Sequence, residues 1–351
     1  MGTLQLYTAD GRGVVQTRVC PLPDCTSAIV RREINGEYSL TATFPAGAGF
    51  LNEIQIGRAV SAQVNEAGNT QNFIVKRRTR SITGGMVIYA EHQSYLYNGI
   101  MLGANTANPG GYVSVVFNAI RTYAVPSITD IAIFTYSRTS GLRADFPARP
   151  TPKTLTQMLK DHLIGSAGGE CIFDGFNVEY VNQMGADNGA RYVYGSNLTE
   201  METEDIIDDY SSGIYPFWGR AGDENKPIQT ISGGVLNYTG NFPVTVIKPV
   251  DFTENFDTQP TQAELLAAAE DYALLNAPSG IPMSIRAARA RIAGDVPVDL
   301  GDVVTVTNTP FGIDKKTRVV ALNFDALRGR VENVELGTIN PGFPWAVKKM
   351  K

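Results

Sequence analysis

The sequence predicts a β-rich α+β fold made of several domains, and three features indicate it. Short runs of alternating apolar and polar residues recur along most of the chain, as in strands with one buried face. Glycine (35) and proline (19) are plentiful, as the turns between many strands require. A few segments instead repeat apolar residues at helical spacing. Because the chain has 351 residues and domains average about 150, we expect two to four domains.

The amino-acid composition and the net charge argue against several classes of protein. Hydrophobic residues make up 43% of the chain and charged residues 19%, the balance of a folded globular protein. The net charge of -5 argues against a dedicated nucleic-acid binder, which needs an excess of Lys and Arg. No apolar run approaches the roughly 20 residues of a membrane span. Met1–Tyr7 lacks the features of a secretory signal, so we expect synthesis and folding in a cytoplasm.

The cysteines do not predict a disulfide scaffold. Their odd number in a long chain, made in a reducing compartment, favours free thiols at Cys20, Cys25 and Cys171. A bridge between Cys20 and Cys25 around Pro21-Leu22-Pro23 is the alternative.

The first hundred residues are expected to form strands. Residues 38–44 alternate apolar and polar side chains directly after Asn35-Gly36, a pair typical of a type I′ hairpin turn. Residues 60–64 alternate in the same way, and Gly84-Gly85 predicts a further hairpin that leads into Met86–His92. Several short strands in so short a stretch favour a small barrel or sandwich.

Three helices are expected farther along the chain. Apolar residues recur at helical spacing over residues 113–124. The second helix is predicted to begin with Thr151 as its N-cap and Pro152 as its first residue. In the third, Thr261 and Glu264 have the spacing of a capping box, in which each side chain accepts a backbone N–H of the other.

Strand patterns fill most of the remainder. The predicted strands are Ile131–Tyr136, Cys171–Phe173, Asn177–Val181, Arg191–Tyr194, Gly213–Trp218, Ile228–Ile231, Val244–Ile247, Met283–Ile292, Val303–Thr307, Arg318–Phe324 and Arg330–Leu336. Two β-rich halves are therefore expected to flank a segment that carries helices.

No pattern assigns a catalytic, cofactor-binding or metal-binding residue. His92 lies in a strand pattern and His162 on an apolar helix stripe, without the second His or Cys of a zinc site, and we interpret both as structural. Nucleophile-elbow and phosphate-loop motifs are absent from the sequence. These observations favour a protein without enzymatic activity.

Two charged segments have more than one interpretation. The acidic cluster at 200–209 offers oxygen ligands for Ca²⁺ but does not have the spacing of an EF-hand, so we favour a solvated acidic face or a subunit contact. Its acidic residues are Glu200, Glu202, Glu204, Asp205, Asp208 and Asp209. The basic run Lys76-Arg77-Arg78-Thr79-Arg80 could face a polyanion, but its place in a strand pattern favours an exposed or interface edge.

Several segments, taken in order, resemble the phage tail hub family, also called prophage tail or tail-associated (Tal) proteins. The segments that carry the resemblance are Asn35–Leu40, Phe44-Pro45, Glu53–Gly57 with the strand from Val60, Tyr89–Leu96, Gly168–Glu170, Phe173-Asp174, Val178, Tyr194–Leu198, Gly213–Trp218, Val298–Val306 and Val334–Gly337. Two departures stand out. Gly185–Gly189 occupies a turn where relatives often carry an Arg-Gly pair, and the chain stops at Lys351 where relatives often continue into a peptidase, lysozyme or fibre region. The resemblance is therefore weak evidence for enzymatic activity in this chain.

The resemblance implies an architecture similar to the baseplate hub of contractile phages. In such hubs, two barrel-like domains of each subunit alternate around a homotrimeric ring. By this likeness, residues 1–97 and 250–345 would be the two ring domains, 98–190 an α/β insertion, 191–249 a β-rich linking segment and 346–351 a tail.

The function that the resemblance implies is mechanical. The ring would close the tail tube at the tail tip of a virion and attach distal components. Expected partners are the distal tail protein (Dit), the tape-measure protein, tail-tube proteins and receptor-binding proteins, with the bacterial cell surface as a further contact and DNA only in passage through the channel. The alternatives are a tail-associated cell-wall hydrolase or peptidase and a cell-wall glycan-binding adhesin.

Overall fold

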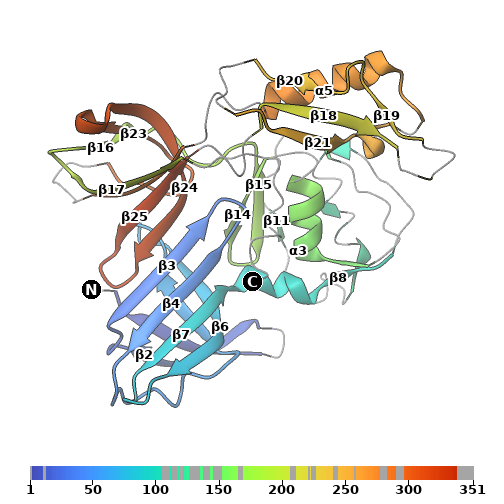
Figure 1. Ribbon diagram of the computed structural model, residues 1–351. Coiled ribbons are helices and arrows are strands. Elements are labelled where there is room, and N and C mark those ends of the chain that lie inside the picture. Colours follow the sequence, from blue (N-terminus) through green and yellow to red (C-terminus); the bar gives the residue numbers. More distant parts are fainter. Residues whose placement is uncertain are drawn as a thin grey trace. The chain divides into compact units, whose positions relative to one another are not determined.

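The computed structural model divides into two compact units, which are described separately (Figure 1). One unit comprises residues 1–202 and 286–351, and the other comprises residues 203–285. The structure describes residues 2–10, 13–104, 111–112, 117–118, 120, 122–125, 135–136, 143–144, 152–164, 169–205, 211–219, 222, 227–239, 244–256, 258–276, 283–289 and 296–337.

The first unit is built on a 13-stranded sheet. The seven N-terminal strands lie together at one end of the strand order of this sheet. These are β1 (Leu4–Ala9), β2 (Val15–Leu22), β3 (Ser27–Glu33), β4 (Tyr38–Phe44), β5 (Ala59–Gln63), β6 (Thr70–Arg80) and β7 (Met86–His92). Their order is β3-β4-β7-β6-β5-β1-β2, and each neighbouring pair is antiparallel. The predicted period-two alternation is present, since Leu40, Ala42 and Phe44 of β4 are buried.

The hairpin predicted at Asn35-Gly36 is present, but its turn type differs from the prediction. A type I′ turn needs positive φ at both residues, whereas only Asn35 has it, at 54°. The loop between β3 and β4 has four residues, 34–37, and the Asn35 side chain bonds to a distant segment of the chain. Its Nδ2 donates to the Gly169 carbonyl at 3.0 Å, and its Oδ1 accepts from the Cys171 N–H at 2.9 Å.

The C-terminal strands extend the same sheet. They are β16 (Ala190–Val193), β17 (Leu198–Asp205), β22 (Met283–Arg289), β23 (Val303–Asn308), β24 (Ile313–Asp325) and β25 (Arg330–Gly337). The 3-10 helix η4 (Thr309–Phe311) connects β23 to β24. Antiparallel pairing of β24 with β3 joins the two ends of the chain, with Phe324 opposite Val30. From β17 to β2 the order is an open path, so the described strands do not form a closed barrel.

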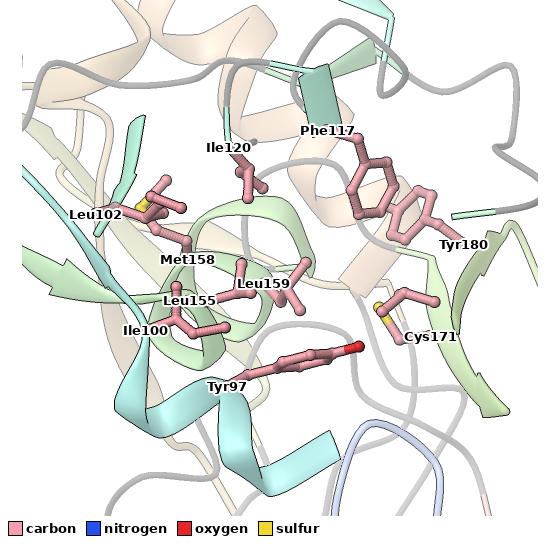
Figure 2. Packing of buried hydrophobic residues seen from close by; sticks show 12 residues of the cluster. Tyr97, Ile100, Leu102, Phe117, Ile120, Leu155, Met158, Leu159, Cys171 and Tyr180 are labelled. Carbon is pink, nitrogen blue, oxygen red and sulfur yellow. The ribbon is translucent and has the colours of Figure 1, made fainter. Parts of the chain in front are cut away.

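A smaller α/β layer of the first unit packs around one short helix. Its elements are η1 (Gln93–Gly99), β8 (Met101–Leu102), β9 (Gly111–Tyr112), β10 (Ala124–Val125), β11 (Thr135–Tyr136), β12 (Arg143–Ala144), β13 (Lys153–Thr154), α3 (Leu155–Gln157), the π-helical turn η2 (Met158–Ile164), β14 (Glu170–Asp174) and β15 (Asn177–Val181). Figure 2 shows its core, in which Leu155 and Leu159 lie among Tyr97, Cys171 and Tyr180.

The predicted start of the second helix is wrong by three residues. Thr154, not Thr151, is the N-cap, and it forms a capping box with Gln157. The reason is strand pairing, because Lys153 and Thr154 form β13 opposite Leu102 and Met101 of β8 and cannot be helical. In the first predicted helix, residues 117–118, 120 and 122–123 are helical, and its other residues lie outside the described part of the chain.

The second unit is a four-stranded sheet covered by one helix. Its elements are β18 (Gly213–Trp218), β19 (Gln229–Thr230), β20 (Leu236–Asn237), β21 (Ile247–Asp251), η3 (Thr253–Asn255) and α5 (Gln262–Asn276). Leu265 and Ala269 of α5 pack against Trp218 in its core. The predicted capping box is confirmed, since the Thr261 N–H donates to Glu264 Oε2 at 2.7 Å and the Glu264 N–H to Thr261 Oγ1 at 3.2 Å.

The β-rich character that the sequence predicts is confirmed, whereas the two barrel-like domains and their boundaries remain a prediction. The described helices include none that is long and apolar enough to cross a membrane.

Candidate functional site

A buried ion pair ties the middle of the chain to its C-terminal strands. Arg318 of β24 donates to both carboxylate oxygens of Glu170 of β14, at 2.6 and 2.7 Å. The guanidinium also donates to the Gly301 and Met184 carbonyls, at 2.8 and 2.6 Å. Only 15% of the Arg318 side chain and 7% of the Glu170 side chain are exposed. Because the two charges neutralise each other and Arg318 has further acceptors, the pair fixes β14 to β24 without leaving a buried charge unpaired.

Beside this pair, two loops cross at van der Waals distance. Gly185 and Gly301 both have positive φ, 78° and 88°. A Cβ atom on Gly185 would lie 2.1 Å from the Gly301 carbonyl carbon, so only glycine fits there. Asp302 holds the crossing, because its carboxylate accepts the Ala186 N–H at 3.0 Å and the Asp299 N–H at 2.8 Å. The turn that departs from the family pattern is therefore fixed by backbone contact with the C-terminal half.

A cavity of about 330 Å³ lies next to the crossing, inside the first unit. It is mostly apolar and is walled by the β3–β4 loop, η1, α3, η2, β14 and the 299–302 loop. The lining side chains used below are Arg32, Tyr38, Tyr95, Thr156, Lys160 and Asp299.

The cavity wall has two buried polar atoms without a hydrogen-bond partner, Arg32 Nε and Thr156 Oγ1. The other end of the Arg32 guanidinium pairs with Asp299. Lys160 lies 5.9 Å from the centre of the Tyr95 ring. This wall suits a ligand or partner side chain that is apolar and carries a hydrogen-bond acceptor.

The acidic side chains of the cavity wall are engaged in structural contacts. Glu33 pairs with Arg31 at 2.5 Å and accepts the Glu37 N–H at 3.1 Å. Glu37 accepts from Ser39 at 2.8 Å. Asp299 and Asp302 have the partners given above. Each of these carboxylates is therefore held by protein partners in this structure.

The interpretation of His92 as a structural residue is confirmed. The ring is fully buried and stacks on Tyr38 with 4.2 Å between ring centres. Its Nδ1 lies 2.9 Å from Ser94 Oγ and its Nε2 3.1 Å from Gln71 Oε1. Burial, together with the nearby charge of Arg32, lowers the pKa of His92 to about 3. The ring is therefore neutral at physiological pH. The side chain of His162 lies outside the described part of the structure.

The acidic cluster is only partly described. Glu200 and Glu202 are exposed on β17. The side chains of Glu204 and Asp205, and all of Asp208 and Asp209, lie outside the described residues. Within the described part of the chain, no group of three His, Cys, Asp or Glu side chains gathers in a way that could hold a metal ion.

All three cysteines are free thiols in this structure. Burial raises the pKa of Cys25 to about 11 and that of Cys171 to about 12. Cys20 is partly exposed, and burial raises its pKa in the same direction. These thiols are protonated at neutral pH and are poor nucleophiles.

The basic run lies along the second half of β6. Strand β5 pairs with β6 only from Thr70 to Ile74, so residues 76–80 pair with β7 alone. Lys76, Arg77 and Arg80 are exposed. The interpretation as an exposed strand edge is therefore confirmed.

Sequence reasoning missed the ion pair of Glu170 with Arg318. The only local signal is one carboxylate beside the apolar run Cys171–Phe173. Its partner lies 148 residues away, beyond the reach of any spacing rule.

The fold of this chain is similar to those of several solved structures, and the similarity covers nearly the whole chain. The chain has the fold of prophage tail proteins. It resembles prophage tail protein gp18 from Listeria monocytogenes EGD-e with a TM-score of 0.66 and 13% sequence identity, over 96% of this chain and 95% of that one. The prophage MuSo2 43 kDa tail protein from Shewanella oneidensis gives a TM-score of 0.58 at 12% identity, over 97% and 98% of the two chains.

A tail protein from Neisseria meningitidis MC58 also gives a TM-score of 0.58, at 13% identity and with the same coverage of 97% and 98%. No protein-family profile matches the chain, and no curated protein is similar to it in sequence. At these identities the likeness concerns the tail-protein fold.

Proposed function

We propose that this protein is a non-enzymatic structural subunit of a phage or prophage-derived tail, and that three copies form the hub of its tail tip or baseplate. The observation that carries the proposal is the tail-protein fold, shared over 96% of this chain and 95% of its structural relative. A match to nearly the whole of both chains, rather than to one shared module, favours a shared role in the assembly.

The proposed hub closes the tail tube and connects it to distal components. Residues 1–97 and 250–345 would supply the two ring domains of each subunit, with 98–190 as an insertion. The partners would be the distal tail protein, the tape-measure protein, tail-tube proteins and receptor-binding proteins, and DNA would only pass through the channel. Such a function depends on large subunit contacts rather than on a reactive pocket.

The described side chains favour this function over the two alternatives. A cell-wall hydrolase needs an available acid, whereas the carboxylates of the cavity wall are held by Arg31, Arg32 and backbone N–H groups. A glycan-binding adhesin presents exposed aromatic rings. Trp218 is 1% exposed and donates its indole N–H to the Phe256 carbonyl at 3.2 Å, so it is not part of such a platform. A platform would rest on exposed rings such as Tyr194, Tyr215 and Phe311, and these three lie in different segments of the chain.

Gold-labelled antibody on intact particles tests the proposed position. The expected result is label at the distal end of each tail, visible by electron microscopy. Label distributed along the tube, on the head, or missing from particles that contain the other tail proteins would contradict the proposal.

A further inference from the structure

The exposed half of β6 forms a basic surface. We define it as Lys76, Arg77, Arg80 and the tip of the β6–β7 hairpin, residues 81–85. Among the residues that the structure describes, Glu91 is the one carboxylate that pairs with it, 3.9 Å from Lys76 Nζ. Arg77 lies over the Tyr89 ring at 5.3 Å, which leaves its charge available at the surface. The surface therefore has a surplus of positive charge on a protein whose net charge is -5.

Apolar side chains accompany this charge. Ile82 at the tip of the β6–β7 hairpin is fully exposed, and 40% of Val87 on β7 is exposed. Exposed apolar residues beside an incompletely paired strand are typical of surfaces that another chain covers.

The opposite charge lies on a terminal strand of the same sheet. β17 pairs with β22 and is the first member of the strand order, far from β6 in that order. Its sequence, LTEMETED, carries four carboxylates and no cation. Glu200 and Glu202 are exposed. The same sheet thus has an acidic strand, β17, at one end of its order. It also contains the basic strand β6, whose second half pairs with β7 alone.

We propose that the acidic strand β17 of one copy of this chain docks against the basic surface on β6 of the next copy. The two surfaces differ, so the contact is head-to-tail, and such contacts close into rings when the rotation between subunits allows it. The inference rests on the proposed trimer and names the surfaces that would hold it together. The occupant is a second copy rather than nucleic acid, because the chain carries its own complement of the basic surface and is acidic overall.

Charge reversal tests the contact. One variant carries Lys76→Glu, Arg77→Glu and Arg80→Glu, and a second carries Glu200→Lys and Glu202→Lys. Because like charges then face each other, each variant alone is expected to weaken self-association by roughly 100-fold, as measured by light scattering over a concentration series. A chain that carries both sets of reversals restores opposite charges and is expected to regain the wild-type mass.

A matched variant controls for the change in charge itself. Lys315→Glu with Glu332→Lys alters exposed residues of β24 and β25 and is expected to leave the mass unchanged. If the wild type is a trimer and both reversal variants remain trimers, the proposed contact is wrong while the trimer stands. If the combined variant stays dissociated, charge complementarity is not the basis of the contact. A wild type that is monomeric at every concentration overturns the trimer and the contact together.

Discussion

Removing the buried guanidinium of Arg318 should cost more stability than any change to a surface charge. Arg318→Met keeps an unbranched apolar stem but deletes four donated hydrogen bonds, two to Glu170 and one each to the Gly301 and Met184 carbonyls. The Glu170 carboxylate, 7% exposed, then loses its cation and, among the described residues, keeps the Met184 N–H as its donor at 2.7 Å. Breaking a buried ion pair on one side typically costs about 3–5 kcal/mol, and we expect a loss in this range.

The assay is urea unfolding followed by far-UV circular dichroism, at one fixed protein concentration because assembly also stabilises the folded state. Arg328→Met is the control, because Arg328 pairs with Asp325 at 3.2 Å but its side chain is 62% exposed. Its loss should stay under about 1 kcal/mol. Each single variant, Glu170→Gln or Arg318→Met, leaves one buried charge unpaired, whereas the double variant removes both charges. The double variant should therefore lose less unfolding free energy than the sum of the two single losses. If Arg318→Met costs no more than Arg328→Met, the ion pair does not fasten β14 to β24.

Three further predictions follow from local geometry. Because the folded pKa of His92, about 3, lies below its ordinary value of 6.5, the unfolded state takes up a proton first as pH falls. Stability should then decrease by up to about 1.4 kcal/mol per pH unit between these two values, and His92→Gln should flatten this slope in urea titrations; an unchanged slope would refute the assignment. Gly185→Ala should lower the melting temperature well beyond Gly189→Ala, because both have positive φ but only Gly185 meets backbone atoms; equal shifts would contradict the close crossing. Iodoacetamide should label Cys20 first in the folded protein and the two buried thiols only after unfolding, as peptide mass spectrometry would show; rapid labelling of all three would oppose their burial.

Local patterns predicted most of the elements because local physics decides them. The capping box at Thr261 and Glu264 was confirmed because both partners lie within one helical turn. The β3–β4 hairpin was predicted correctly but its turn type was not. The Asn35 side chain of this turn bonds to residues 169 and 171, more than 130 positions away, a contact that no local pattern reveals. The N-cap at Thr154 was missed for a similar reason, since pairing with β8 decides where the helix begins.

The candidate site was less predictable than the fold. Glu170, Arg318 and the Gly185–Gly301 crossing each join segments that are remote in sequence, and no spacing rule connects them. What the sequence did predict correctly were residues with local signals, such as the buried His92 in an alternating strand and the basic edge on β6.

The native mass of the purified protein tests the central claim, a trimeric tail hub, most directly. Size exclusion with light scattering should give about 114 kDa, three times the 38.0 kDa chain, and negative-stain images should show threefold rings. A stable species of 38.0 kDa at every concentration, with no ring even after mixing with the other tail proteins, would contradict the account.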